Sequence, residues 1–456
     1  MMLARDVRTV ADVQKIVDAR NLSHIKVGVF DTDGILRGKY LSKQKFLSAL
    51  AHGFGFCDVV LGWDCQDQLY DNVEYTGWHT GYPDAQLRII AQSCRDLPME
   101  ADGLFFLAEF TGSAEQVCPR AILRRVIDTA SRMGLKALAG FEYEFFVFNE
   151  TRESIRQKKY QDLQPLAPGF FGYSVLRNTV DAAFYQQILS LGQRMDFPLE
   201  GLHEETGPGV LEAAIHYDHA LESADKAALF KTFTKVIAQT QGLIATFMAK
   251  WSPQWPGQSG HIHISLTDHD QNPLFYEAEA DHSMSLTMRH FVAGQQKFMP
   301  ELLALIAPTI NSYTRLVPGF WAPTGAEWGV DNRTCALRVV TGDAHSQRVE
   351  YRIGAADANP YLILAAALLS GLEGIEQGLV LAPAIKGNAY EQQSVPERQL
   401  PSSLWQAAQR LRKSTVARKY LGDVFVDHYA ASREWEEREF RKHITDWELE
   451  RYFEII

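Results

Sequence analysis

The sequence predicts an α+β protein in which a small β-rich domain precedes a larger domain of alternating strands and helices. Two observations support this class. Residues 20–112 contain short apolar segments separated by Gly, Asp and Pro residues, a pattern typical of short strands and turns. After residue 118, strand-like runs alternate with longer runs of helical period. We therefore expect one domain over residues 1–115 and a second over residues 116–456.

The first domain begins with a helical pattern over residues 8–21. Residues 24–46 then predict a hairpin, because two strand-like runs flank the turn sequence D-T-D-G at 31–34. A second helix is expected over 44–54. Gly-rich and aromatic loops with short strands are expected over 55–90, followed by short strands over 96–110.

The second domain opens with a helix at 121–134, which follows Pro119 and ends at Gly134, the usual order of these two residues around a helix. Mixed charges over 434–456 are typical of a terminal helix with a solvated face. The remaining strands are predicted at 136–148, 208–216, 261–266, 335–340 and 348–353, and the helices at 179–194, 219–249, 283–305 and 358–377.

Composition excludes several classes of protein. The 456-residue chain carries a net charge of −11 and has no long basic run, which disfavours general nucleic-acid binding. Its five cysteines are scattered without a CxxC pair, so we expect a reducing, cytoplasmic location. The N-terminus lacks the apolar core of a signal peptide. The most apolar helical segment, 361–372, is short and predicts a buried helix, not a membrane span.

The predicted strand A-G-F-E-Y-E-F-F-V-F at 139–148 carries two carboxylates, Glu142 and Glu144. Residues two apart in a strand point to the same face, so these anions converge. A divalent cation is the simplest neutraliser, and oxygen ligands favour Mg²⁺ or Mn²⁺. The alternative is a solvated strand edge with surface glutamates.

Two further segments supply the same kind of ligand. H-E-E-T-G-P-G-V-L-E at 203–212 places Glu204 and Glu212 on either side of a turn, and Glu205 competes with Glu204 for the first role. G-H-I-H-I-S-L at 260–266 puts His261 and His263 on one strand face, although an H-x-H pattern alone favours a structural or surface role.

Five arginines follow in segments rich in Gly, Pro and aromatic residues, around the carboxylate of Glu350. Arginine forks match the oxygens of phosphates and carboxylates, and phosphoryl transfer depends mainly on positioning and charge neutralisation. For any single arginine, a surface salt bridge is the simpler explanation. The five are Arg315, Arg333, Arg338, Arg348 and Arg352.

In order and spacing, these segments resemble the motifs of the glutamine synthetase superfamily, type I. The motifs are GFEYEFF, HEETGPGVLE, GHIHISL, NSYTRLVPG, DNRTCALR and RVEYRIGAADANPYL, and the resemblance extends over residues 116–377. It implies an N-terminal β-grasp domain and a catalytic domain with a curved antiparallel sheet. It also implies a homo-oligomer, usually a dodecamer, with active sites between neighbouring subunits.

The resemblance implies a reaction of glutamate, ATP and an amine that uses two or three Mg²⁺ or Mn²⁺ ions. One ion would be bound by Glu144, Glu204 and Glu212, and another by Glu142, His261 and Glu350. Arg315, Arg352 and Gly257 would bind glutamate; Arg333, Arg338 and Arg348 would hold phosphate oxygens; and His263 and Ser265 would line the nucleotide pocket.

The sequence departs from the family at the position of the amine. Authentic glutamine synthetases carry a glutamate in a flap after N-S-Y-x-R-L, where this chain has Trp321, and an indole cannot take a proton from ammonium. Asp64 corresponds to a second family carboxylate, and Pro256 replaces an asparagine. Further aromatic residues in the expected amine segments are Trp63, Phe320 and Trp328.

We therefore expect a γ-glutamylamide synthetase whose acceptor is an organic amine, with an apolar alkyl or aryl amine favoured over a polyamine. One alternative is an authentic glutamine synthetase that uses ammonium. Others are an inactive regulatory or scaffold homologue, and a ligase or kinase for a different acid. Tyr390 lies where some family members are adenylylated, but its surroundings match poorly, so we interpret it as an ordinary loop residue.

Overall fold

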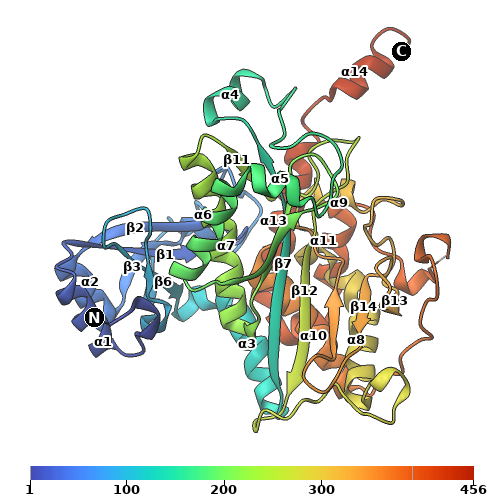
Figure 1. Ribbon diagram of the computed structural model, residues 1–456, viewed down its shortest axis with the longest axis horizontal. Helices are drawn as coiled ribbons and strands as arrows, with labels where there is room; N and C mark the ends of the chain where they lie inside the picture. The colour runs from blue at the N-terminus through green and yellow to red at the C-terminus, as the bar shows by residue number, and fades with distance from the viewer. Residues whose placement is uncertain (1, 393) are drawn as a thin grey trace.

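The computed structural model describes residues 2–392 and 394–456, which form two sheets with helices packed around them (Figure 1). The first sheet has six strands in the order β2-β1-β6-β4-β3, with β5 beside β6. Helices α1 (Val10–Ala19) and α2 (Lys43–His52) accompany this sheet. Its strands are β1 (His24–Phe30), β2 (Leu36–Ser42), β3 (Phe54–Cys57), β4 (Asp84–Ile89), β5 (Arg95–Asp96) and β6 (Leu104–Phe110).

The predicted hairpin is present between β1 and β2. Asp31 Oδ1 accepts hydrogen bonds from the backbone N–H groups of Asp33 and Ile35, at 3.1 and 2.8 Å. Gly34 has a φ of +77°, a conformation that residues with a side chain rarely adopt. The D-T-D-G sequence therefore forms this turn through its own side chain and its glycine.

The second sheet has nine strands in the order β13-β14-β15-β12-β7-β9-β8, with β10 and β11 also pairing with β7. Together with the surrounding helices it confirms the predicted α+β class. The strands are β7 (Lys136–Phe148), β8 (Leu199–Glu204), β9 (Val210–Ile215), β10 (Asp218–His219), β11 (Ile244–Thr246), β12 (Gly260–Thr267), β13 (Trp328–Val330), β14 (Leu337–Val340) and β15 (Arg348–Tyr351).

The long strand β7 separates the core from the site. Phe141, Tyr143 and Phe145 are buried with aromatic residues of α7 (Ala220–Thr240) and of the segment after β11. Because side chains alternate along a strand, Glu142 and Glu144 point to the opposite face. The apolar core thus fixes the strand that presents both carboxylates.

Helices α8 (Leu286–Ile306) and α10 (Pro360–Glu376) pack closely behind the sheet (Figure 1). A Cβ added at Gly294 would lie 2.1 Å from the carbonyl oxygen of Ser370, so only glycine permits this approach. The apolar segment 361–372 is buried in α10, as expected. The remaining longer helices are α3 (Pro119–Arg132), α4 (Arg152–Gln157), α5 (Val175–Val180), α6 (Ala182–Arg194), α11 (Leu404–Lys413), α12 (Thr415–Leu421), α13 (Asp423–Phe440) and α14 (Asp446–Tyr452).

A buried ion-pair network joins the first sheet to these helices. Arg120 on α3 donates two hydrogen bonds of 2.9 Å to Asp225 on α7 and one of 2.7 Å to Glu109 on β6. The Asp225 carboxylate also accepts a hydrogen bond of 2.7 Å from Tyr361 on α10. Side chains of α3, α7, β6 and α10 therefore meet in one buried network.

Two predicted helices are wrong in extent. The helix expected over 219–249 ends at Thr240, because Gly242 has a φ of +71° and β11 follows. The tail 434–456 is interrupted after Phe440, and α14 begins anew with a capping box at Thr445.

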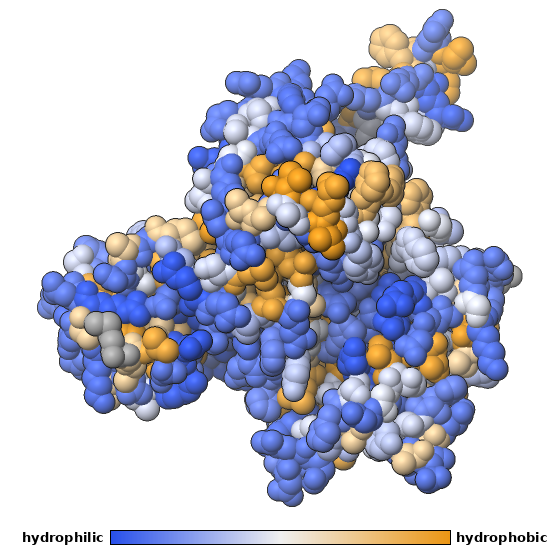
Figure 2. Space-filling model, in the orientation of Figure 1, coloured by the Kyte–Doolittle hydropathy of each residue, from blue (hydrophilic) through white to orange (hydrophobic). Residues whose placement is uncertain are grey.

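Apolar side chains gather at two places on the surface. Helix α14 projects from the body, and its exposed apolar residues include Trp447, Leu449 and Phe453 (Figure 1). A second group, which includes Val175 and Leu176, lies on and around α5 (Figure 2). In the described part of the chain, none of the helices combines the length and the apolar character that crossing a membrane requires.

Candidate active site

The sheet brings the sequence-distant acids and histidines together by register. On neighbouring strands, His203 faces Glu212, and Glu212 faces Glu144. Cross-strand partners point to the same face, so this row across β8, β9 and β7 converges. A parallel row places Glu142 on β7 opposite His261 on β12.

A third row contains His263, Glu350 and Arg338 on β12, β15 and β14. Together the rows line a cavity of about 520 Å³. The predicted site residues that line it are Glu142, Glu144, Glu212, Gly257, His261, His263, Arg315, Trp321, Arg333, Arg338, Arg348, Glu350 and Arg352.

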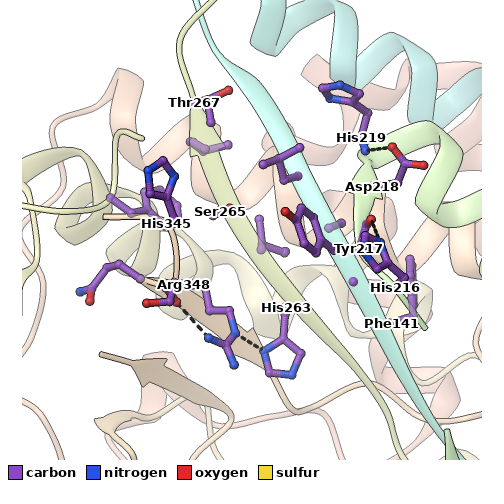
Figure 3. Close-up of a pocket in the computed structure, with 18 of the residues that line it drawn as sticks. Phe141, His216, Tyr217, Asp218, His219, His263, Ser265, Thr267, His345 and Arg348 are labelled. Carbon is purple, nitrogen blue, oxygen red and sulfur yellow. Dashed lines mark hydrogen bonds between the residues drawn. The ribbon is translucent and has the colours of Figure 1, made fainter. Parts of the chain in front are cut away.

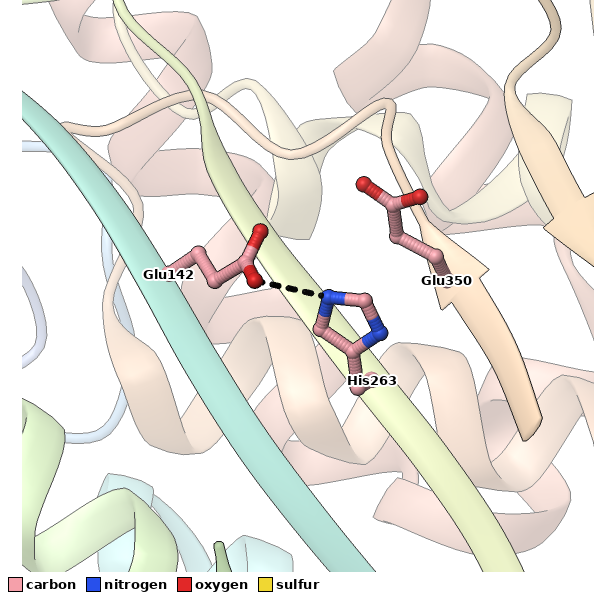
Figure 4. A group of neighbouring side chains, drawn as sticks. All are labelled: Glu142, His263 and Glu350. Carbon is pink, nitrogen blue, oxygen red and sulfur yellow. Dashed lines mark ion pairs between the residues drawn. The ribbon is translucent and has the colours of Figure 1, made fainter. Parts of the chain in front are cut away.

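One group of cation ligands lies between β7, β12 and β15 (Figure 4). His263 Nε2 is 3.1 Å from Glu142, and His261 Nδ1 is 3.4 Å from Glu350. Possible ligand atoms of Glu142, His263 and Glu350 all lie within 4.8 Å of one another. This mixed set of carboxylate and imidazole groups fits a divalent cation.

A second group contains Glu144, Glu205 and Glu212, and it corrects one sequence prediction. The structure places Glu205 in the cavity, whereas Glu204 is buried outside it, on the side of α5 and α6. Adjacent residues at the end of a strand point to opposite faces, so only one of the two can join Glu212. The choice of Glu204 was wrong, and the competing candidate Glu205 occupies the position.

The electrostatics of the acids also fit cations. Burial raises the pKa of Glu212 to about 9, and the negative charges of Glu144 and Glu142 add to this. Burial also opposes ionisation of Glu142, but the neighbouring imidazoles of His261 and His263 outweigh burial and lower the pKa of Glu142 overall. Carboxylates this close repel one another, and a bound cation would relieve that repulsion.

Arg315 lies at the base of the cavity. Its guanidinium donates hydrogen bonds to the carbonyl oxygens of Ile353 and Arg352, at 3.0 and 3.3 Å. Burial lowers the pKa of Arg315 to about 10, which still leaves it charged at neutral pH. A Cβ at Gly257 would lie 2.7 Å from Arg315 Cγ, so the glycine makes room for this side chain.

Three other arginines connect to the acid and histidine groups. Arg352 and Arg338 donate hydrogen bonds of 2.6 and 3.0 Å to separate oxygens of Glu350. Arg348 Nε donates to His263 Nδ1 at 3.0 Å. These contacts fix the orientation of the cavity wall, while Arg333 lines it as well.

A second cavity, of about 780 Å³ (Figure 3), lies beside the first. Glu142, His263 and Arg348 line both cavities. The walls of the second cavity include Tyr217 after β9 and Ser265 on β12 (Figure 3). The geometry can therefore hold an extended ligand whose charged end meets the cations and arginines.

The lining of the first cavity also contains aromatic residues. Tyr173, Phe320 and Trp321 line it, and Trp321 is 60% exposed. Trp321 has a φ of +58°, which is a strained backbone conformation for a bulky residue. Strained backbone conformations are frequent at functional sites. Lys250 Nζ lies 4.1 Å from the centre of the Phe320 ring, a cation–π contact that holds the segment before Trp321.

Some predicted residues lie elsewhere. Asp64 is outside its own chain's cavity, and its Oδ1 accepts hydrogen bonds of 2.8 Å from the backbone N–H groups of Gln66 and Gln68. The expectation that Trp328 lines the amine site is wrong, because Trp328 is buried and donates to the Ala382 carbonyl at 2.7 Å.

Trp63 and Tyr390 are not among the lining residues either. Trp63 packs against the Arg37 guanidinium, and Tyr390 is half-buried in a short helical turn.

Among the residues at or beside the site that sequence reasoning missed are His203, Tyr173 and Lys250. His203 could have been found from its two-residue spacing to Glu205, the same signal that linked Glu142 and Glu144. Tyr173 stands in the aromatic run F-F-G-Y, which carries only a weak signal. Lys250 carried no signal, because its role depends on a contact with a distant segment.

Comparison with known proteins agrees with this geometry. The family model described as glutamine synthetase, catalytic domain, matches residues 116–452. The chain is 46% identical over 440 residues to type-1 glutamine synthetase 2 of Dictyostelium discoideum, covering 95% of this chain and 84% of that protein. It is 36% identical over 453 residues to the glutamate–isopropylamine ligase of a Pseudomonas species, covering 98% and 99%.

Two further matches are informative. The chain is 37% identical over 449 residues to the gamma-glutamylethanolamide synthetase of Streptomyces coelicolor, covering 98% of this chain and 96% of that one. A solved structure titled apo GmaS without ligand matches with a TM-score of 0.84 at 24% identity, covering 97% and 100%; this match bears on the fold.

Proposed function

The chain belongs to the glutamine synthetase family, and from that premise we propose that it joins the γ-carboxylate of glutamate to an organic amine at the expense of ATP. The observation that carries the proposal is Trp321, which stands at the family's flap carboxylate and lines the cavity. The isopropylamine and ethanolamide enzymes among its relatives support an amine acceptor.

We assign the two anionic substrates to the two cavities. Arg315 and Arg352 are the proposed partners of the glutamate carboxylates, since a guanidinium fork matches a carboxylate. Arg333, Arg338 and Arg348 are the proposed partners of the ATP phosphates. The nucleotide would extend into the cavity lined by Ser265 and Tyr217.

The divalent cations, Mg²⁺ or Mn²⁺, would neutralise the charge that two anions bring together and that develops in transfer. The residues that we propose as ligands are Glu144, Glu205 and Glu212 on the glutamate side and Glu142, His261 and Glu350 on the ATP side. The number of ions, two or three, is part of the proposal.

The proposed reaction has two steps. A γ-carboxylate oxygen of glutamate attacks the γ-phosphorus of ATP, and the bond to the ADP oxygen breaks, which gives γ-glutamyl phosphate. The nitrogen of a neutral amine then attacks the γ-carbonyl carbon. The C–O bond to phosphate breaks, the amine nitrogen loses a proton, and the amide and inorganic phosphate remain. The arginines stabilise the negative charge on the transferred group.

An apolar alkyl or aryl amine fits the aromatic lining of the cavity better than a polyamine does. Tyr173, Phe320 and Trp321 offer apolar surface to a substituent. The second ammonium of a polyamine would need a carboxylate, but the carboxylates that line the cavity are all assigned to cations. The Lys250 ammonium behind Phe320 would also repel it.

The experiment is an ATPase assay coupled to ADP formation, with glutamate and a panel of amines at equal concentration. We expect faster ADP formation with alkyl and aryl monoamines than with putrescine, and the slowest ADP formation with ammonium. Mass spectrometry of the product would identify the amide. Higher turnover with ammonium than with every organic amine would overturn the proposal.

A second candidate is an authentic glutamine synthetase. The Dictyostelium relative with that name, 46% identical, favours it. In this case Trp321 would serve only for packing, and the same amine panel would show ammonium as the best acceptor.

We also propose a homo-oligomer, as the resemblance implies, with a dodecamer as the expected form. The exposed apolar residues of α14 and α5 support a surface that other copies cover. Asp64, outside its own cavity, is then available to a neighbouring subunit. Mass photometry of the purified protein would test this, and a monomer would contradict it. A cytoplasmic location remains a prediction.

A further inference from the structure

One histidine in the site has no assigned role. His203 on β8 is the cross-strand partner of Glu212, which in turn faces Glu144 on β7. All three therefore point to the face that forms the cavity. The register that positions the two acids thus also presents an imidazole to the same face of the sheet.

The distances at His203 suit coordination. Its Nε2 lies 3.4 Å from Glu205 Oε2, and possible ligand atoms of His203, Glu205 and Glu212 all lie within 4.8 Å of one another. Adjacent ligands of an octahedral ion, each ~2.1 Å from the metal, are ~3 Å apart. These three side chains therefore need little movement to surround one ion.

The two facing atoms also lack other partners. His203 Nε2 and Glu205 Oε2 are buried and have no hydrogen-bond partner within the described part of the chain. A buried polar atom without a protein partner is available to a ligand or a water. Here the two atoms lie 3.4 Å apart.

The orientation of the imidazole is fixed. The Tyr173 ring stacks on His203 with the centroids 4.5 Å apart and an angle of 10° between the planes. Glu144, in contrast, already uses Oε2 to accept a hydrogen bond of 2.7 Å from the backbone N–H of Ser259. One oxygen of Glu144 is thus already bonded to the protein, whereas His203 Nε2 has no hydrogen-bond partner in the described part of the chain.

We propose that His203 Nε2 is a ligand of the glutamate-side cation, together with Glu205 and Glu212. The inference rests on the proposed function, because it assumes that a divalent cation binds there. Mg²⁺ is a hard ion that strongly prefers oxygen, whereas Mn²⁺ accepts imidazole more readily. A nitrogen ligand should therefore shift this site toward Mn²⁺.

The test is Mn²⁺ binding to the metal-free full-length protein. Isothermal titration gives the affinity of each site, and pulsed electron paramagnetic resonance detects a nitrogen nucleus bound to Mn²⁺. We expect His203→Gln to weaken one site ~10–100-fold, as loss of a ligand contact does. It should also reduce the nitrogen signal, leaving the part that comes from His261, the proposed ATP-side ligand. His24→Gln, an exposed histidine on β1, is the matched control and should change neither.

Unchanged affinity and nitrogen signal in His203→Gln would overturn the assignment. Weaker binding with an unchanged nitrogen signal would also overturn it, because His203 would then act only by orienting Glu205. Circular dichroism of His203→Gln verifies that the fold is intact. A wild-type protein that binds no Mn²⁺ would instead contradict the proposed function itself.

Discussion

Glu204 and Glu205 are consecutive in the sequence, yet they face opposite sides of the sheet at the end of β8. Glu205 lines the cavity with Glu212, whereas Glu204 is buried on the side of α5 and α6. Burial raises the pKa of Glu204, and the Arg177 charge partly offsets this. The pair therefore provides two chemically identical residues, of which one serves the site.

Glu205→Gln should abolish most of the activity and weaken Mn²⁺ binding, because it removes a negative ligand from the cation group. Glu204→Gln is the matched change one residue away. It should leave the Mn²⁺ affinity within ~3-fold of wild type, since its face holds no proposed ligand. Isothermal titration with Mn²⁺ and the coupled ATPase assay measure both. The reverse result would restore Glu204 as the ligand.

Trp321→Glu should shift the preferred acceptor from an organic amine to ammonium. The new carboxylate would stand where authentic family members carry one, and it could neutralise ammonium and accept its proton. We expect the ratio of kcat/KM for ammonium to that for isopropylamine to rise at least ~10-fold, which corresponds to ~1.4 kcal/mol.

The control for this change is Trp405→Glu, at an exposed tryptophan on α11, which should leave the ratio unchanged. If Trp321→Glu lowered both activities equally, Trp321 would contribute to packing of the flap and not to selection of the amine.

The sequence predicted the parts of the site that depend on local periodicity. The same-face placement of Glu142 and Glu144 follows from the period of a strand, and β7 has the predicted bounds. The prediction for Trp328 was wrong because the sequence shows that the residue is aromatic but not which face of the short strand β13 carries its side chain. Its burial depends on the distant Ala382 carbonyl.

Local sequence patterns also do not show how neighbouring strands are aligned in the sheet. The row of His203, Glu212 and Glu144 depends on how β8, β9 and β7 are aligned, and a shift by one residue reverses every side chain. This is why the choice between Glu204 and Glu205 needed the structure. The position of Asp64 outside the cavity also could not be predicted from local patterns, because hydrogen bonds within its own turn determine where its side chain points.

Gly257→Ala should raise the KM for glutamate at least ~10-fold while the KM for ATP changes little. The new Cβ would lie 2.6 Å from the Ala249 carbonyl oxygen and 2.7 Å from Arg315 Cγ, so Arg315 must move. Because Arg315 is the proposed partner of a glutamate carboxylate, its displacement should weaken glutamate binding more than ATP binding. Gly201→Ala on β8 is the control, because its Cβ meets only Ala214 Cβ at 3.8 Å.

Glu109→Gln should destabilise the protein in a manner that depends on pH. Glu109 is 1% exposed and bonds Arg88, Arg120 and Arg124. Burial raises its pKa, but these arginines outweigh burial and lower the pKa of Glu109 below its ordinary 4.5. Breaking such a buried pair costs about 3–5 kcal/mol near neutral pH.

Because the folded-state pKa of Glu109 is depressed, its stabilisation is fully present above pH 4.5, the unfolded value, and is lost as the pH falls through the folded value. The difference in unfolding free energy between wild type and Glu109→Gln should therefore stay constant from about pH 7 to about pH 5 and shrink below that. Urea denaturation at each pH measures it. Glu115→Gln, an exposed partner of Arg124, should cost less than ~1 kcal/mol throughout. A difference that grew toward acid would mean that Glu109 is protonated in the folded protein, and the arginine network would then not stabilise a charged carboxylate.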